Sequence, residues 1–243
     1  MSFSALPSNL KLLHQGEEDL RLKSAQLIGA DQALLLHLHA VEGAMDMLDV
    51  LRQVPTEDED LKVILVLGMR VFNAFASSLK LILSGYYQHG AMIMRDILET
   101  VFLLDLFRTD RPAITRWRLA DKKMRKKDFK PVVVREALDK RDGFTTKKRA
   151  LMYELFSELA SHPSMESISM LRPKGMDARN GPFVDPTALE ATLSEMGRLA
   201  VQTGEKVEAF FPPDWRQADA TRLSFMRYKK AWITEFYSPS SRE

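Results

Sequence analysis

The sequence predicts an all-α protein, a helical bundle around a central antiparallel helix hairpin. Apolar residues recur with the helical period along most of the 243 residues, and alternating β-branched patterns bounded by turns are scarce. Breakers separate the periodic runs at Pro55, Ser84-Gly85, Pro112, Pro131, Gly143, Pro163 and Pro212-Pro213. We therefore expect helices over residues 9–28, 31–53, 58–83, 86–108, 111–128, 131–141, 146–162, 187–210 and 215–236.

The two N-terminal helices are expected to cover the hairpin. On the second, His39, Glu42, Asp46 and Asp49 share one face at spacings of three, four and three. These residue types bind metals, but one helix cannot close a metal site. Carboxylate-bridged di-metal bundles need a His three residues after a Glu on two helices, and no Glu in the chain is followed in this way. We predict a solvated face and neither metal nor cofactor.

The next two helices form the hairpin, and each carries a narrow polar stripe on an apolar background. The stripes span roughly 80° and about 120° at the helical period. Their members are Lys62, Arg70, Asn73, Ser77, Lys80 and Ser84 on the first helix, and Gln88, His89, Arg95, Asp96 and Glu99 on the second. The short Ser84-Gly85 link predicts an antiparallel pair that brings the level of Arg70 near Glu99.

Two interpretations of these stripes remain open. If they face inward, the charges must be paired or bind something, because an isolated buried charge is too costly. That predicts a ligand pocket lined by Arg70, His89, Arg95 and Glu99. The alternative is that each stripe is the solvent side of an amphipathic helix, or a satisfied structural network.

Residues 108–149 form a basic arm in a protein whose formal net charge is only +2. The arm holds 16 Lys or Arg against 6 Asp or Glu. Its densest part contains Lys122, Lys123, Arg125, Lys126 and Lys127. Such a patch can follow a phosphate backbone through salt-dependent contacts without reading bases. The alternative is a solvated face that balances the acidic clusters at 17–19 and 57–60, within the molecule or in a dimer partner.

Residues 163–186 are rich in Pro and Gly and predict a long loop or a small β-hairpin. Just before them, Glu158 and His162 are four residues apart at the end of a predicted helix. This pair could be an oriented general base or a C-terminal capping interaction. We expect a single helical domain over residues 1–237 and a frayed tail at 238–243.

Several chemistries are excluded by composition and motif. The chain has no cysteine, which removes disulfides, thiolate metal sites and cysteine nucleophiles. The P-loop, the dinucleotide fingerprint, the Gly-x-Ser-x-Gly elbow and the zincin motif do not occur. No secretion signal precedes the charged start, and charges interrupt the apolar runs near 63–71 and 91–107. We expect a soluble cytoplasmic protein that does not enter a membrane.

A family resemblance begins at residues 84–99, Ser-Gly-Tyr-Tyr-Gln-His-Gly-Ala-Met-Ile-Met-Arg-Asp-Ile-Leu-Glu. The segments 159–163, Leu-Ala-Ser-His-Pro, and 181–185, Gly-Pro-Phe-Val-Asp, fit the same pattern. Over about residues 60–210 the chain resembles a group of uncharacterised bacterial all-helical proteins that are distantly similar to HEPN helical bundles. The resemblance implies a site at Arg95, Glu99 and His162. HEPN ribonucleases carry an Arg and a His close together on one helix, and this chain lacks that pair, which argues against nuclease chemistry.

Two hypotheses for function follow. The first, which we favour, is a non-enzymatic binding or interaction module whose basic arm contacts nucleic acid or an acidic protein partner. The second is a small-ligand pocket or a weak, ribonuclease-like hydrolase site, in which Arg95 holds an anion and His162 is the base. In either case, exposed Met-rich and aromatic segments favour a homodimer.

Overall fold

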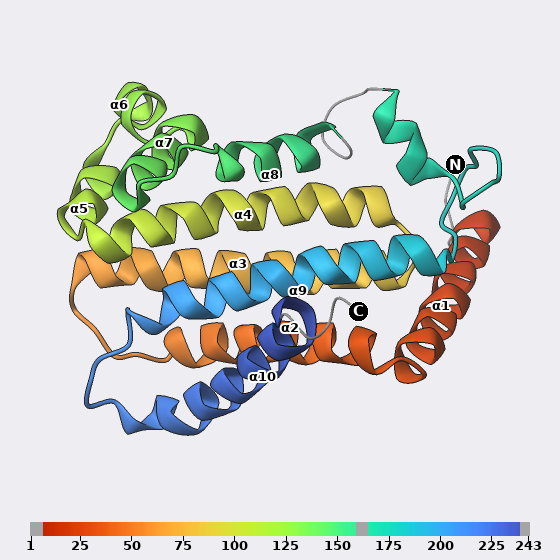
Figure 1. The fold of residues 1–243 in the computed structure, drawn as a ribbon, viewed down its shortest axis with the longest axis horizontal. Helices are drawn as coiled ribbons and strands as arrows, with labels where there is room; N and C mark the ends of the chain where they lie inside the picture. The colour runs from red at the N-terminus through yellow and green to blue at the C-terminus, as the bar shows by residue number, and fades with distance from the viewer. Residues whose placement is uncertain (1–6, 159–164, 239–243) are drawn as a thin grey trace, which may run out of the picture.

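Four long helices lie side by side in the computed structural model, which describes residues 7–158 and 165–238 (Figure 1). They are α2 (Gln32–Leu51), α3 (Glu59–Leu83), α4 (Tyr87–Thr109) and α9 (Pro186–Glu208). Helix α2 packs on α3 and α9, and α4 packs on the same two, so the four helices close into a bundle. The predicted all-α fold is confirmed, and the described residues contain no strand.

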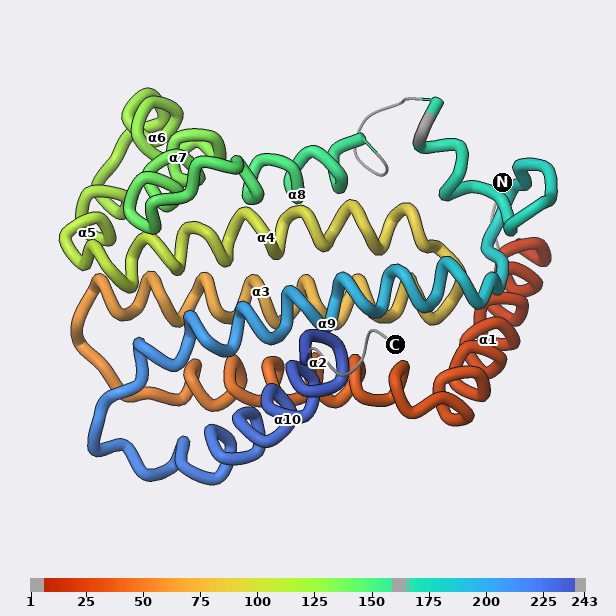
Figure 2. The backbone as a smooth tube through the Cα atoms, viewed as in Figure 1, coloured from red at the N-terminus to blue at the C-terminus, as the bar shows by residue number. Residues whose placement is uncertain are grey.

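Shorter or peripheral helices surround the bundle. Helix α1 (Ser8–Gly29) lies across one end, and α10 (Asp219–Tyr237) covers α2. The basic arm lies along α4 on the side opposite α10 (Figure 2). It consists of α5 (Pro112–Leu119), α6 (Lys122–Asp128), α7 (Pro131–Asp142) and the start of α8 (Lys148–Phe156). Two short 3-10 helices, Glu166–Leu171 and Arg216–Ala218, lie in the connections before α9 and α10.

The α3–α4 hairpin depends on Gly85. This residue has a φ of +86°, a conformation that side chains with a Cβ rarely adopt, and it ends α3 as a left-handed residue. A Cβ at Gly85 would also lie 2.7 Å from the backbone nitrogen of Phe183, which donates to the Gly85 carbonyl at 3.3 Å. The predicted antiparallel pairing is confirmed, because Arg70 of α3 hydrogen-bonds Asp96 of α4 at 2.5 Å.

Helix α10 is attached to the bundle by two buried aromatic side chains. The Phe225 ring lies against Gly43 of α2 and Gly204 of α9, where the missing side chains leave room for it. Two turns further on, Trp232 lies against Gly197 and donates to His37 of α2 at 2.8 Å. These contacts seat α10 across the α2–α9 pair.

The structure corrects the prediction of one helix over 111–128. Ala120 is buried and extended, with φ −66° and ψ 133°, and it separates α5 from α6. The Asp121 side chain then accepts from the backbone nitrogen of Met124 and caps α6. The periodicity did not reveal this break, because an extended alanine carries no sequence signature.

The sequence predicts a long loop or a small β-hairpin for the segment before α9, and the described residues of this segment do not contain the hairpin. Residues 165–185 contain the 3-10 helix Glu166–Leu171 and no strand, so the β-hairpin alternative is not found there. The loop is attached to the bundle through Asp185. Its side chain accepts from the backbone nitrogens of Lys174 and Ala188, and its own nitrogen donates to the buried Tyr87 hydroxyl at 3.1 Å. The loop end is therefore held by α4 and α9 together.

Among the helices of the described residues, α3 has the length and the apolar composition of a helix that could cross a membrane. Core helices of bundles pass the same test, and α3 packs against α2, α4 and α9. Most of its polar stripe faces outward: Arg70, Asn73, Ser77 and Lys80 are exposed, whereas Lys62 is half-buried and Ser84 is buried at the hairpin link. Over Arg70–Lys80 the stripe is a solvent face, as one of the two interpretations predicts.

Candidate functional site

The arginines of the basic arm are all engaged in contacts within the molecule. Five form ion pairs: Arg108 with Asp105, Arg116 with Asp110, Arg118 with Asp60, Arg141 with Asp105 and Asp142, and Arg149 with Asp139 and Asp142. The other three, Arg111, Arg125 and Arg135, lie over the rings of Phe210, Trp117 and Tyr153 at 4.5, 5.3 and 4.1 Å. The planar guanidinium group suits both kinds of contact.

The lysines of the arm behave differently. Within the part of the chain that the structure describes, none of them makes a side-chain hydrogen bond or an ion pair, and all are exposed: Lys122, Lys123, Lys126, Lys127, Lys130, Lys140, Lys147 and Lys148. Half of the 16 basic residues are thus held by the fold, and half are free ammonium groups in water.

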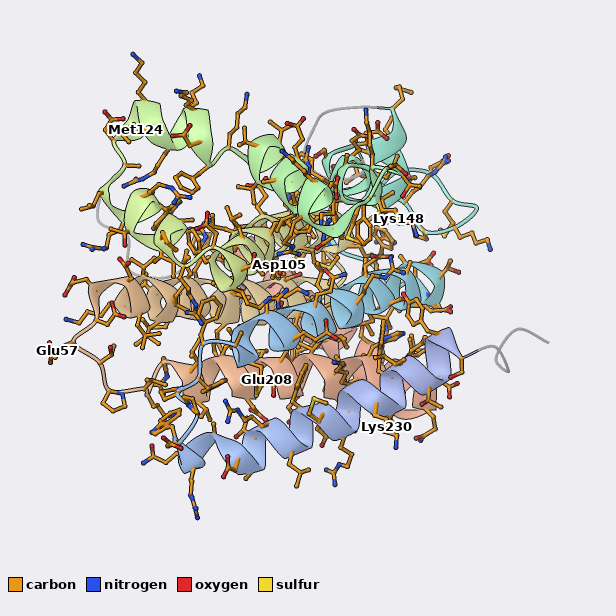
Figure 3. The ribbon with its side chains drawn as sticks, turned by 60° about the vertical axis from the view of Figure 1, so that its left-hand side comes forward. Glu57, Asp105, Met124, Lys148, Glu208 and Lys230 are labelled. Carbon is orange, nitrogen blue, oxygen red and sulfur yellow. The ribbon has the colours of Figure 1, made fainter. Side chains whose placement is uncertain are left out.

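Helix α6 displays the densest group of these lysines. None of its residues is buried, and Figure 3 shows Met124 at one outer edge of the molecule. Arg125, which we grouped with the lysines from the sequence, lies over the ring of Trp117 and holds α6 to α5. The α6 lysines therefore stand on a short helix that is capped by Asp121 and fixed by one cation–π contact.

The acidic turn at 57–60 does not neutralise α6. Asp60 accepts hydrogen bonds from the Thr115 hydroxyl and from Arg118 at 2.8 Å, and these hydrogen bonds lower its pKa. Glu57 and Glu59 both accept from Lys62 of α3. Among the described residues, one arginine of the arm, Arg118, thus pairs with the turn, as the charge-balancing alternative predicts, whereas the α6 lysines make no ion pair with it.

A buried carboxylate lies beneath the arm. The side chain of Asp105, on α4, is only 4% exposed. It accepts from Arg108 at 2.8 Å and from Arg141 at 3.1 and 3.2 Å, and the Lys206 ammonium lies 4.0 Å away. Burial alone would raise the pKa of Asp105, but the hydrogen bonds from Arg141 and Arg108 outweigh it and lower the pKa. This carboxylate fixes the arm to the bundle.

The four residues of the predicted hairpin pocket lie in different surroundings. Arg70 pairs with Asp96 on the surface, with the two side chains 58% and 38% exposed. His89 is exposed at the other end of α4, edge-on to Tyr86, beside a separate hollow of about 210 Å³ that also touches Arg179. The structure thus brings Arg70 to Asp96 and leaves His89 beside a separate hollow, and a pocket common to all four residues stays a prediction.

Arg95 and Glu99 do lie together, on the side of α4 that faces α8. Their side chains are 24% and 30% exposed and approach to 3.3 Å, without hydrogen-bond geometry at the Arg95 Nε. Arg95 also bonds the Tyr153 hydroxyl and lies over its ring at 4.6 Å. Arg135 of α7 lies over the same ring, and its Nε and Nη1 are buried without a hydrogen-bond partner. The Arg95–Glu99 pair is therefore half-buried, and Tyr153 contacts two guanidinium groups.

His162 lies outside the described residues, so the proposed trio with Arg95 and Glu99 stays a prediction, as do the HEPN resemblance and any ligand role of Arg70 and His89. Among the residues that the structure does describe, no three His, Asp or Glu side chains are grouped to hold a metal ion.

The sequence did not single out Asp105, Arg135 or Tyr153. One signal was present for Asp105, a lone carboxylate directly after the apolar run 100–104. A charge at such a position must be buried with partners. Arg135 and Tyr153 carry no such signal, because each is an ordinary residue on a short amphipathic helix.

Exposed apolar side chains gather on α10. Leu223, Met226 and Ile233 are 74%, 44% and 40% exposed, and they line a broad surface hollow of about 880 Å³ with Arg227 and Lys230. This apolar surface is suitable for a homodimer interface, and the homodimer stays a prediction.

No protein-family model, no curated protein and no solved structure matches this chain.

Proposed function

We propose that this chain is a non-enzymatic binding module that contacts the phosphate backbone of nucleic acid through the basic arm, with Lys122, Lys123, Lys126 and Lys127 of α6 as the main contacts. The observation that carries the proposal is the difference between the two residue types of the arm. Its arginines contact other side chains within the fold, and its lysines are exposed and unpaired. Unpaired surface ammonium groups are the groups that phosphates recruit.

The architecture supports backbone contacts rather than base readout. Helix α6 has seven residues, is too short to fill a major groove, and carries no exposed ring for stacking. Of the aromatic residues beside it, Phe129 packs against the core and Trp117 is covered by Arg125. Binding is therefore electrostatic, insensitive to base sequence and strongly dependent on salt.

Fluorescence anisotropy with labelled single-stranded RNA and duplex DNA tests the proposal. The logarithm of the binding constant should fall with the logarithm of salt, with a slope of about 0.9 for each phosphate neutralised on a duplex. The triple variant Lys123→Glu, Lys126→Glu, Lys127→Glu should lose at least tenfold in affinity and show a shallower slope.

A matched control reverses three lysines elsewhere. Lys11 and Lys23 of α1 and Lys230 of α10 are exposed, and Figure 3 shows Lys230 at the edge opposite Met124. The triple variant Lys11→Glu, Lys23→Glu, Lys230→Glu changes the net charge by the same amount. If both triples weaken binding equally, only overall charge matters and the assignment to α6 fails. No binding to either nucleic acid at low salt would refute the proposal and leave the acidic protein partner as the next candidate.

A further inference from the structure

A second feature of the arm is a small pocket between α4, α8 and α9, separate from the α6 lysines. Its volume is about 280 Å³, just below the range of roughly 300 to 1,000 Å³ that is typical of ligand pockets. The residues around it are Val101, Phe102, Asp105, Phe144, Lys148, Arg149, Met152, Gln202 and Lys206. We propose that this pocket binds a small phosphomonoester whose phosphate meets Lys148 and Lys206 and whose body is an apolar ring.

The charges around the pocket favour an anion. Asp105 is the carboxylate on its wall, and Arg108 and Arg141 already neutralise it. Lys206 lies 4.0 Å from Asp105 and 3.9 Å from Glu205, too far for a hydrogen bond to either. Glu205 is itself bonded by Lys229 at 2.7 Å. Lys206 therefore has ammonium hydrogens to give to a ligand.

The other two cations at the pocket differ in availability. Arg149 is held by Asp139 at 2.6 Å and by Asp142, so it is neutralised within the arm. Lys148 is exposed and makes no ion pair in the described part of the chain. Two ammonium groups thus line one pocket: Lys148, which has no ion pair in the described chain, and Lys206, whose ion pairs with Asp105 and Glu205 are too long for hydrogen bonds. A ligand phosphate carries two negative charges and can pair with both ammonium groups, whereas a ligand carboxylate carries only one.

The walls favour an apolar ring on the ligand. Val101 and Phe102 of α4 are buried and Met152 is partly buried. Phe144 stands at the rim, where the guanidinium of Arg149 lies 5.0 Å from its ring centroid and 49% of the residue's surface is still exposed. An exposed aromatic beside a methionine and two lysines provides a surface on which a planar ring can stack. An inorganic phosphate would leave this apolar surface unused.

Ligand-observed NMR with phenyl phosphate tests the site. Saturation of protein methyl resonances should transfer to the phenyl ring protons, and phenol and inorganic phosphate should each bind at least tenfold more weakly. The variant Lys148→Gln, Phe144→Ala alters two exposed residues, so it should fold normally and lose at least tenfold in affinity. Lys206→Gln should show a similar loss, and Lys230→Gln on α10 should bind as the parent does.

Three outcomes would overturn the proposal: equal binding of phenol and phenyl phosphate, unchanged affinity in Lys148→Gln, Phe144→Ala, or an equal loss in Lys230→Gln. The site does not depend on nucleic-acid binding. The α6 triple variant should retain phenyl phosphate binding, so failure of one proposal leaves the other to be judged by its own assay.

Discussion

The indole nitrogen of Trp232 donates a hydrogen bond to Nδ1 of His37 at 2.8 Å, joining α10 to α2 in a buried contact. Phe236 stacks on a face of the imidazole, with the ring centroids 4.3 Å apart. Because Nδ1 accepts, the imidazole is neutral with its proton on Nε2. Burial lowers the pKa of His37 to about 4, from an ordinary value of 6.5, against a smaller opposing effect of Asp31.

This contact predicts a loss of stability in mild acid. Between pH 6.5 and 4 the unfolded state binds a proton at His37 and the folded state does not, so the free energy of unfolding falls as the pH falls. From pH 7 to pH 5 the contribution of His37 is about 2 kcal/mol. Urea denaturation at both pH values measures it. In His37→Gln, whose amide oxygen can still accept from Trp232, the drop should shrink by that amount. An identical drop in both proteins would contradict the assignment.

Replacing Asp105 by Asn should destabilise the protein by about 3 kcal/mol at pH 7, because the change leaves two guanidinium groups around a neutral side chain. Asp110→Asn is the matched control: Asp110 pairs with Arg116 on the surface, with the side chains 40% and 57% exposed. Exposed pairs contribute less than about 1 kcal/mol. Chemical denaturation of both variants measures the difference, and equal effects would show that Asp105 is not the anchor of the arm.

Two glycines give opposite predictions for the same substitution. A Cβ at Gly204 of α9 would overlap the fully buried ring of Phe225, so Gly204→Ala should lower stability by about 1 to 3 kcal/mol. At Gly16 of α1 no atom lies within 4 Å, and alanine there should raise helix stability by up to about 1 kcal/mol. Thermal melts of the two variants should shift in opposite directions. If both melting temperatures shifted in the same direction, the packing of Phe225 against Gly204 would be contradicted.

The division between arginines and lysines in the arm also predicts stability. Lys126→Gln and Lys127→Gln should each change the free energy of unfolding by less than about 0.5 kcal/mol, as surface changes do. Arg149→Gln removes a guanidinium that is 14% exposed and bonded to Asp139 and Asp142, and it should cost about 2 kcal/mol. Urea titrations decide between the two classes. If the lysine variants were as damaging as Arg149→Gln, the lysines would be structural too.

The long helices could be predicted because each one buries a face that repeats with the helical period. The short Ser84-Gly85 link then dictated the antiparallel hairpin, which the Arg70–Asp96 bond confirms. The break at Ala120 could not be predicted in this way, since burial of one small residue in an extended conformation depends on what packs around it. The 3-10 helix at Glu166–Leu171 was missed for a related reason. Its apolar run is as compatible with a strand as with a tight helix, and packing against α4 decides.

The sequence by itself determined the helical class, the hairpin and the position of the basic arm, because these follow from local periodicity and from charges that are neighbours along the chain. Only the tertiary structure decided which charges are available. Arg118 meets Asp60 from 58 positions away, and Arg141 meets Asp105 from 36. Ion pairs at such separations exist only once the helices have packed. Which basic residues stay unpaired, namely the exposed lysines of the arm, is therefore a property of the folded chain.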